Sequence, residues 1–203
     1  MCTSKRLAEL ALLSMPASAA CMDSIRLGSV LGSEGSVVPR LLEPIARGGP
    51  VTVTDPDVER YFPTMGETVQ RVVDCAASRL GDFAIAIPVT GAPIRIVDLA
   101  RYLIEQASVK DVEITHAGLG PGDKLQEQFL SDREAVLGSP VDSVQWIDSP
   151  GVTEAELTGG LAELNTALDD TNPPQLLTVL ARLVREYQSS SFLLQPAGAS
   201  LAH

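Results

Sequence analysis

The stretch RLGSVLGSEGSVVP, from Arg26 to Pro39, joins a short apolar segment to a loop that contains three glycines and three serines. Glycine lets a backbone adopt positive φ and approach a ligand closely, while serine hydroxyls and free amides donate hydrogen bonds to phosphate or sugar oxygens. The local pattern fits a polar ligand-binding edge and an ordinary strand-to-helix turn equally well. The rest of the sequence is needed to decide between these two interpretations of the loop.

The composition indicates a globular protein. The chain has 203 residues, 45% hydrophobic and 20% charged, enough for one domain, or one and a fraction, with a real core. A formal net charge of −11 argues against nucleic acids and anionic membranes as partners, because both are bound through clustered Lys and Arg. Cys2, Cys21 and Cys75 form no CxxC pair, and with only His116 and His203 they predict neither a metal site nor a disulfide framework.

The amino-terminal segment resembles a signal peptide in part. Lys5 and Arg6 precede an apolar run that ends at Cys21, as in a lipoprotein signal. Glu9 inside the run and Pro16 near its end instead favour an amphipathic helix. No run reaches the roughly 18 apolar residues that a membrane span needs. We therefore expect a cytoplasmic protein, with a lipoprotein anchored through Cys21 as the alternative.

Hydrophobic periodicity and turn residues predict an α/β chain without internal repeats. The predicted helices span residues 5–14, 37–47, 64–80, 94–107, 153–168 and 175–187, and the predicted strands span 22–27, 51–54, 83–89 and 112–115. The glycine and proline loop that begins at Gly118 is expected to run into a further helix by Phe129. No strand is followed by the GxGxxG turn of a dinucleotide-binding half.

Taken together, several collinear stretches resemble the carboxy-terminal half of the extended short-chain dehydrogenase/reductase superfamily, in particular the CapD-like nucleotide-sugar 4,6-dehydratases of bacterial polysaccharide biosynthesis. The stretches are MCTSKRLAEL, RLGSVLGSEGSVVP, GGPVTVTDPDVERYF, PIRIVDLARYLIE, GLGPGDKLQEQFLSD and LVREY. The resemblance implies a remnant of a Rossmann domain and a small α/β substrate-binding domain, without the amino-terminal Rossmann half and with a helical carboxy terminus. The implied divisions are 1–50 for the cofactor-domain remnant, 51–148 for the substrate-binding part, 149–187 for the terminal helices and 188–203 for a flexible tail.

The resemblance also implies catalytic and cofactor-binding residues. In this family a tyrosine and a lysine four residues later begin a helix, and one dehydratase branch has methionine in place of the tyrosine. The matching pair here is Met1 and Lys5. Such a lysine binds the nicotinamide ribose of NAD or NADP and lowers the pKa of a neighbouring acid. Gly28 is expected to face the same cofactor.

The implied substrate is a nucleotide sugar, with UDP as the expected carrier. The loop after the first strand is expected to face the sugar, the strand 51–54 to lie along the base, and Arg60 to hold the diphosphate. Asp123 is expected to accept the ribose hydroxyls, Lys124 to replace in part an arginine lost at Gly120, and Glu127 to support the loop. The implied substrate-binding residues are Ser29, Ser33, Gly35, Ser36, Val51, Thr52, Arg60, Asp123 and Lys124.

Three functions follow from this resemblance. The first is the substrate-binding half of a UDP-sugar 4,6-dehydratase that is inactive alone, because the cofactor sheet and most catalytic residues of the family lie upstream of the matched region. The alternatives are a non-catalytic nucleotide-sugar-binding or dimerisation module and a fragment of a UDP-sugar 4-epimerase. In each case the first helix and the strand 22–27 are expected to expose apolar surface, which favours association with the missing half or with a second copy.

Overall fold

The computed structural model describes residues 3–15, 22–78, 83–120, 122–139 and 141–187. The catalytic candidate Met1, the anchor candidate Cys21 and the predicted tail at 188–203 lie outside these ranges. Within them, no helix is long and apolar enough to cross a membrane.

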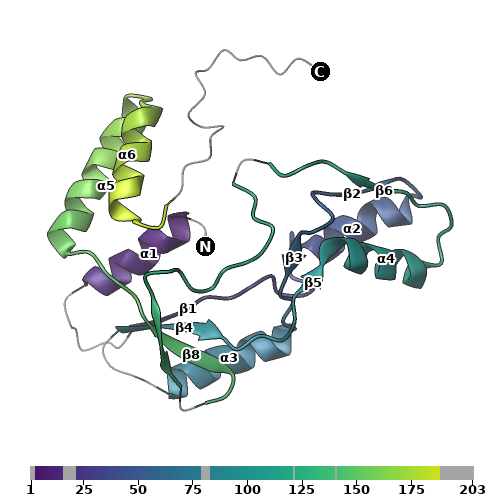
Figure 1. Cartoon of the computed structure of the whole chain (residues 1–203), viewed down its shortest axis with the longest axis horizontal. Helices are drawn as coiled ribbons and strands as arrows, with labels where there is room; N and C mark the ends of the chain where they lie inside the picture. The colour runs from purple at the N-terminus through teal and green to yellow at the C-terminus, as the bar shows by residue number, and fades with distance from the viewer. Residues whose placement is uncertain (1–2, 16–21, 79–82, 121, 140, 188–203) are drawn as a thin grey trace.

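One lobe is built on a four-stranded mixed sheet in the order β1-β4-β8-β7 (Figure 1). β1 (Met22–Ile25) runs parallel to β4 (Phe83–Pro88), and β4 pairs antiparallel with β8 (Val144–Asp148), which pairs antiparallel with β7 (Ala135–Gly138). The two faces of this sheet alternate along β4. Ile85 and Ile87 pack with Leu13 of α1 (Thr3–Ser14), while Ala86 packs with Cys75 of α3 (Met65–Ala77).

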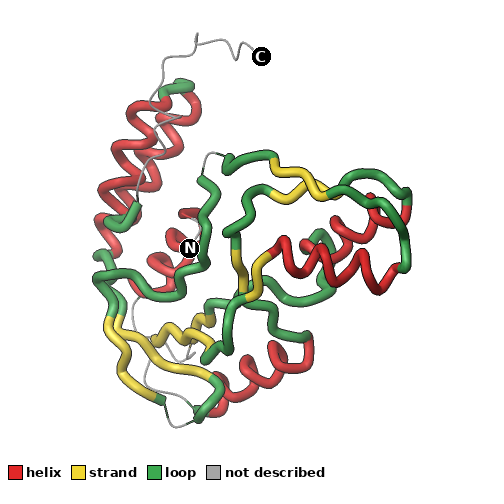
Figure 2. Tube along the Cα trace, turned by 45° about the vertical axis from the view of Figure 1, so that its right-hand side comes forward, coloured by secondary structure: helices red, strands yellow, loops and turns green. Residues whose placement is uncertain are grey.

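The second lobe contains α2 (Val37–Ala46) and α4 (Ile96–Ala107) packed on two short parallel strands, β2 (Val51–Val53) and β6 (Ile114–His116). Its core is aliphatic and consists of Leu41, Ile45, Val51, Val53, Val58, Ile96 and Ala100. A two-residue antiparallel ladder, β3 (Glu59–Arg60) with β5 (Ile94–Arg95), lies where the chain passes between the lobes (Figure 2). The chain therefore crosses from one lobe to the other several times.

The terminal helices α5 (Glu154–Asp169) and α6 (Pro173–Leu183) form a hairpin beside α1 (Figure 1). Thr153 caps α5 by accepting a hydrogen bond from the Glu156 amide, and the Glu156 side chain accepts one from the Thr153 amide. Leu10 of α1 is only 2% exposed because it packs against this hairpin. The expectation that the first helix exposes its apolar face is therefore wrong for this chain, since its own terminal helices cover that face.

Six of the seven predicted helices and all four predicted strands are found within the described residues, with their ends shifted. The helix predicted by Phe129 is absent from the described part of 118–134. Gly118 and Gly122 have φ values of 81° and 84°, which interrupt a helix, and the carbonyls of Lys124 and Leu125 accept from Arg60 instead of from amides one turn later. The strands β3, β5, β7 and β8 were not predicted, and β5 occupies the first two residues of the helix predicted at 94–107.

The packing does not follow the predicted divisions of the sequence. β4 and β8, from the range 51–148, share a sheet with β1, while α2, from the range 1–50, packs with β2 and α4. Segments of the two ranges are interleaved in space, so the division at residue 50 is not a boundary between lobes. The functional division stays a prediction.

Candidate functional site

A groove of about 460 Å³ opens on the second lobe, at its junction with the Gly/Ser loop. Its polar groups come from five residues on four segments, and its walls are otherwise apolar. The polar lining is Ser29, Arg40, Thr52, Thr54 and Arg60, and the apolar lining is Val37, Leu41, Pro44, Pro50, Val58 and Ile96. The groove thus brings together three predicted substrate-binding residues, Ser29, Thr52 and Arg60.

The alternation of β2 decides which of its side chains reach the groove. Val51 and Val53 are 0% and 2% exposed and lie in the core, whereas Thr52 and Thr54 line the groove. The Thr52 hydroxyl lies 3.2 Å from that of Thr115 on β6. Val51, predicted to contact substrate, has its side chain in the core and its amide bonded to the Glu113 carbonyl. Of the predicted pair, Thr52 alone presents a side chain to the groove.

Glu127, which the resemblance places in support of its own loop after Gly118, instead contacts the start of the Gly/Ser loop. Its carboxylate accepts a hydrogen bond from the Ser29 hydroxyl at 3.3 Å and one from the Tyr61 amide at 3.4 Å. Gly28 is tightly packed, because a Cβ atom there would lie 3.2 Å from both the Phe129 ring and the Tyr61 carbonyl and 3.3 Å from Glu127, so these neighbours would have to shift by a few tenths of an ångström. The space on the Cβ side of Gly28 is therefore filled by Tyr61, Glu127 and Phe129.

The rest of the loop leads into α2 without lining the groove. The Ser33 hydroxyl donates to the Val30 carbonyl at 3.0 Å, and Gly35 has a φ of 70°. Ser36 is the residue before α2, and its buried hydroxyl has no hydrogen-bond partner in the described part of the chain. These three predicted substrate contacts stay predictions.

Arg60 lines the groove, but most of its donors are used within the protein. Its Nη1 donates to the carbonyls of Glu59 and Leu125 at 2.7 and 2.9 Å, and its Nη2 donates to the Lys124 carbonyl at 2.8 Å. Its Nε lies 4.0 Å from a Glu127 oxygen. In this geometry Arg60 holds the segment 118–134 against β3.

Asp123 and Lys124 lie on that segment, are exposed and do not line the groove. The Asp123 carboxylate accepts from the Gly120 amide at 2.8 Å, which closes a local turn, and the Lys124 ammonium donates to Gln128 at 3.4 Å. Neither contact tests the predicted roles in ligand binding.

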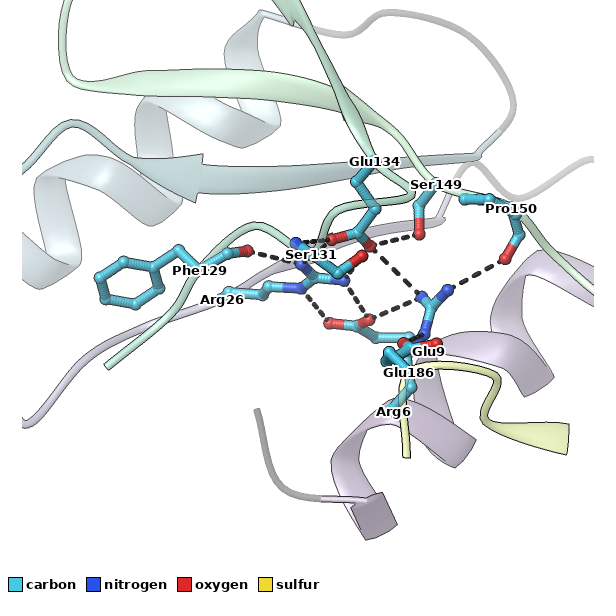
Figure 3. Close-up of polar contacts among 9 residues, drawn as sticks. All are labelled: Arg6, Glu9, Arg26, Phe129, Ser131, Glu134, Ser149, Pro150 and Glu186. Carbon is cyan, nitrogen blue, oxygen red and sulfur yellow. Dashed lines mark hydrogen bonds and ion pairs between the residues drawn. The ribbon is translucent and has the colours of Figure 1, made fainter. Parts of the chain in front are cut away.

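A buried ion-pair network joins α1, β1 and the segment before β7 (Figure 3). Arg26 donates to both oxygens of Glu9 at 2.9 Å, to both oxygens of Glu134 at 2.8 and 2.6 Å, and to the Phe129 carbonyl at 2.6 Å. Arg6 donates to Glu9 at 3.1 Å and forms an ion pair with Glu186 at 2.6 Å. Because Arg26 lies two residues before Gly28, the network sets where the Gly/Ser loop begins relative to α1.

The network perturbs the ionisation of its members. Burial alone would raise the pKa of Glu134, but hydrogen bonds from Arg26, the Ser149 hydroxyl and the Ser131 amide together lower it to about 2. Burial would lower the pKa of Arg26, but its bonds to Glu134 and Glu9 outweigh burial and raise it. The network was missed from the sequence, where Arg6 was interpreted as part of a signal-like basic region. The sequence contains one signal for this network, namely charged residues within apolar segments. Arg6 and Glu9 lie three residues apart in the first predicted helix, and Arg26 lies at the end of the first predicted strand.

The described residues do not form a dinucleotide site by themselves. Lys5 is exposed on α1, which lies beside α5 and α6 and apart from the groove lobe in Figures 1 and 2. A dinucleotide site has a strand followed by a GxGxxG turn at the amino terminus of a helix, and no described strand is followed by that turn. The described residues therefore do not include the glycine turn that would hold the pyrophosphate of NAD or NADP. Within the same ranges, no group of three His, Cys, Asp or Glu side chains is placed to bind a metal ion.

A family model described as "Polysaccharide biosynthesis protein" matches residues 1–148. The chain belongs to this family. The capsular polysaccharide biosynthesis protein CapD of Staphylococcus aureus is 39% identical over 138 residues, covering 66% of this chain and 23% of CapD. The UDP-glucose 4-epimerase of Rickettsia akari is 26% identical over 110 residues, covering 54% of this chain and 31% of the epimerase. The predicted resemblance to CapD-like proteins is confirmed.

Among solved structures, Pen from Bacillus thuringiensis superimposes with a TM-score of 0.56 and 24% identity, over 74% of this chain and 47% of Pen. This similarity confirms the predicted fold class, a mixed α/β fold that makes up part of a longer chain. The chain spans about a quarter to a third of the length of the two curated relatives.

Proposed function

We propose that this chain is the nucleotide-sugar-binding part of a UDP-sugar 4,6-dehydratase of polysaccharide biosynthesis. The observation that carries the proposal is the groove, in which Ser29, Thr52 and Arg60 meet although they come from three separate segments. Its volume of about 460 Å³ lies within the range of roughly 300 to 1,000 Å³ typical of small-molecule sites.

The lining suits a nucleotide. The apolar walls from α2 and α4 can cover the flat face of a base, while the Thr52 and Thr54 hydroxyls can donate to or accept from its polar edge. The arginines supply positive charge for a diphosphate. The role of this chain is then to bind and orient the nucleotide sugar.

The hydride chemistry of such a dehydratase is supplied by NAD or NADP. The described residues do not form a site for that cofactor, so we assign them no step that depends on it. We further propose that the active enzyme needs residues beyond the described ones, from another part of the protein or from a partner. The free, buried thiol of Cys75 suits a reducing compartment such as the cytoplasm, which stays a prediction.

Calorimetric titration of the full chain with UDP-N-acetylglucosamine tests the proposal. We expect saturable binding that is weakened at least fivefold in the double variant Thr52→Val, Thr54→Val. Thr158→Val, an exposed threonine on α5, is the matched control and should bind as the wild type does. Absence of heat at millimolar ligand, with circular dichroism showing a folded chain, would contradict the proposal.

A non-catalytic nucleotide-sugar-binding module is the second candidate, and the lack of a GxGxxG turn after any described strand favours it. Because the first candidate needs residues beyond the described ones, incubation with UDP-N-acetylglucosamine and NAD⁺ tests whether the chain is catalytic by itself. A sugar that has lost one water would overturn the non-catalytic candidate, and a sugar epimerised at C4 would identify an epimerase. Unchanged sugar, together with measured binding, agrees with a chain that binds the nucleotide sugar but is not catalytic by itself.

A further inference from the structure

Two arginines line the groove, Arg40 on α2 and Arg60 on β3. A diphosphate in the groove needs a charged donor that is free to contact it. The two guanidinium groups differ in how many donors remain available, and this difference decides which one can serve.

Arg60 is committed to the protein. Both of its Nη atoms donate to backbone carbonyls, those of Glu59, Lys124 and Leu125. Turning the guanidinium toward a ligand would break the bonds that hold the segment 118–134 to β3. Its side chain is accordingly only 22% exposed.

Arg40 is uncommitted. Its guanidinium makes no hydrogen bond or ion pair with any residue in the described ranges. The other arginines of this lobe are engaged, since Arg47 pairs with Glu43, and both Arg95 and Arg101 pair with Asp98. Among the described residues that line the groove, Arg40 therefore has the guanidinium that is free to bind an anion.

The position of Arg40 on α2 adds to its attraction for an anion. It is the fourth residue of the helix, near the end where the backbone amides carry partial positive charge. The first turn of α2 contains no acidic residue to offset that charge. A positive side chain near the amino-terminal end of a helix is mildly unfavourable for folding. A bound diphosphate would relieve this repulsion.

We infer that Arg40 contacts the diphosphate of the bound nucleotide, and that Arg60 is a positioning residue that acts through the segment 118–134. This inference rests on the proposed function and names the charged contact within the same groove. It differs from the prediction made from the sequence, in which Arg60 held the diphosphate.

The test uses the full chain with Arg40→Gln, and Arg47→Gln as the matched control. Arg47 lies just past the end of α2, is exposed, carries the same charge and does not line the groove. Binding of UDP and of uridine is measured by ligand-observed NMR titration. We expect Arg40→Gln to weaken UDP binding at least tenfold with uridine binding unchanged, Arg40→Lys to recover part of the loss, and Arg47→Gln to stay within twofold of the wild type.

The possible outcomes separate the two proposals. If wild-type protein binds UDP and Arg40→Gln weakens it no more than Arg47→Gln does, the assignment of Arg40 is wrong and the proposed function stands. An equal loss of UDP and uridine binding in Arg40→Gln also overturns the assignment, because the effect would then not depend on phosphate. If the wild type binds neither UDP nor UDP-N-acetylglucosamine, both proposals are overturned.

Discussion

At the scale of single residues, Arg26 is the centre of the buried network, with hydrogen bonds to Glu9, Glu134 and the Phe129 carbonyl. Burying charges costs several kcal/mol per ion unless partners satisfy them, so such a network is sensitive to the loss of any one member. Its members come from positions as far apart as 6 and 186 in the sequence. The contacts therefore form only once the sheet lobe has assembled.

We predict that Glu134→Gln lowers the free energy of unfolding by about 3 to 5 kcal/mol, because it leaves the buried Arg26 charge partly unpaired. Urea denaturation followed by circular dichroism measures the change. Glu163→Gln is the control, since Glu163 forms an exposed pair with Arg182 and should cost about 1 kcal/mol or less. Equal losses in the two variants would contradict a special role for the network.

The network also predicts a dependence of stability on pH. The pKa of Glu134 is lowered from 4.5 to about 2 in the folded state. A lowered folded-state pKa stabilises the protein above the unfolded value, and this stabilisation is lost as pH falls from about 4.5 toward 2. We expect it to amount to the order of 3 kcal/mol. Thermal melts across this pH range should show a steeper decline in wild type than in Glu134→Gln; parallel declines would refute this.

At the scale of elements, the segment 118–134 depends on a tether formed by distant residues. Arg60 donates to the carbonyls of Lys124 and Leu125, and the Glu59 amide also donates to Leu125. Two glycines with positive φ, Gly118 and Gly122, prevent the segment from satisfying its backbone as a helix. Its ordered path therefore rests on Arg60 and β3.

We predict that Arg60→Gln loosens this segment and raises its rate of tryptic cleavage after Lys124 several-fold, because proteolysis requires local opening. Limited proteolysis with mass-spectrometric mapping measures the rate. Arg101→Gln, which removes an exposed pair with Asp98 in the same lobe, should leave cleavage after Lys124 unchanged. A similar rate in both variants would show that Arg60 does not hold the segment.

At the scale of the whole molecule, the apolar stripe of α3 is exposed. Met65, Val69, Val72 and Val73 are 44% to 55% exposed, and their helical spacing places them on one face. The buried residues of α3 are Thr68 and Cys75 instead. Contiguous exposed apolar surface of this kind promotes association. We therefore expect the association predicted from the sequence to involve α3 rather than α1.

We predict that the double variant Val69→Lys, Val73→Glu reduces self-association of the chain, because it places two charges within the stripe. Dynamic light scattering across a concentration series measures the mean particle size. Leu168→Glu, at a 60% exposed position on α5 outside the stripe, is the control and should change the size little. If both variants associate as the wild type does, the stripe is not the cause.

The sequence by itself determined the local elements and the family. Periodicity and capping residues such as Thr64 and Thr153 identify the helices, since these signals act within a few residues. The strand β8, Val144–Asp148, escaped prediction because its successive residues Trp146 and Ile147 are both buried, which breaks the period of two, and β7 is exposed throughout. Thr52 and Arg60 were identified as site residues from the resemblance.

Only the tertiary structure decided which of these groups are free to act. Arg60 is not available to a ligand, because it donates to the carbonyls of Lys124 and Leu125, which lie more than 60 residues away in sequence. Arg40 is available because its guanidinium has no such partner among the described residues. The partners of Arg26 and the core position of Val51 depend equally on distant segments. Helix and strand preferences arise from residues that are neighbours in the chain. Whether a side-chain hydrogen-bond donor is already paired or is free to bind a ligand depends on residues that are neighbours in space, and no local sequence pattern encodes those.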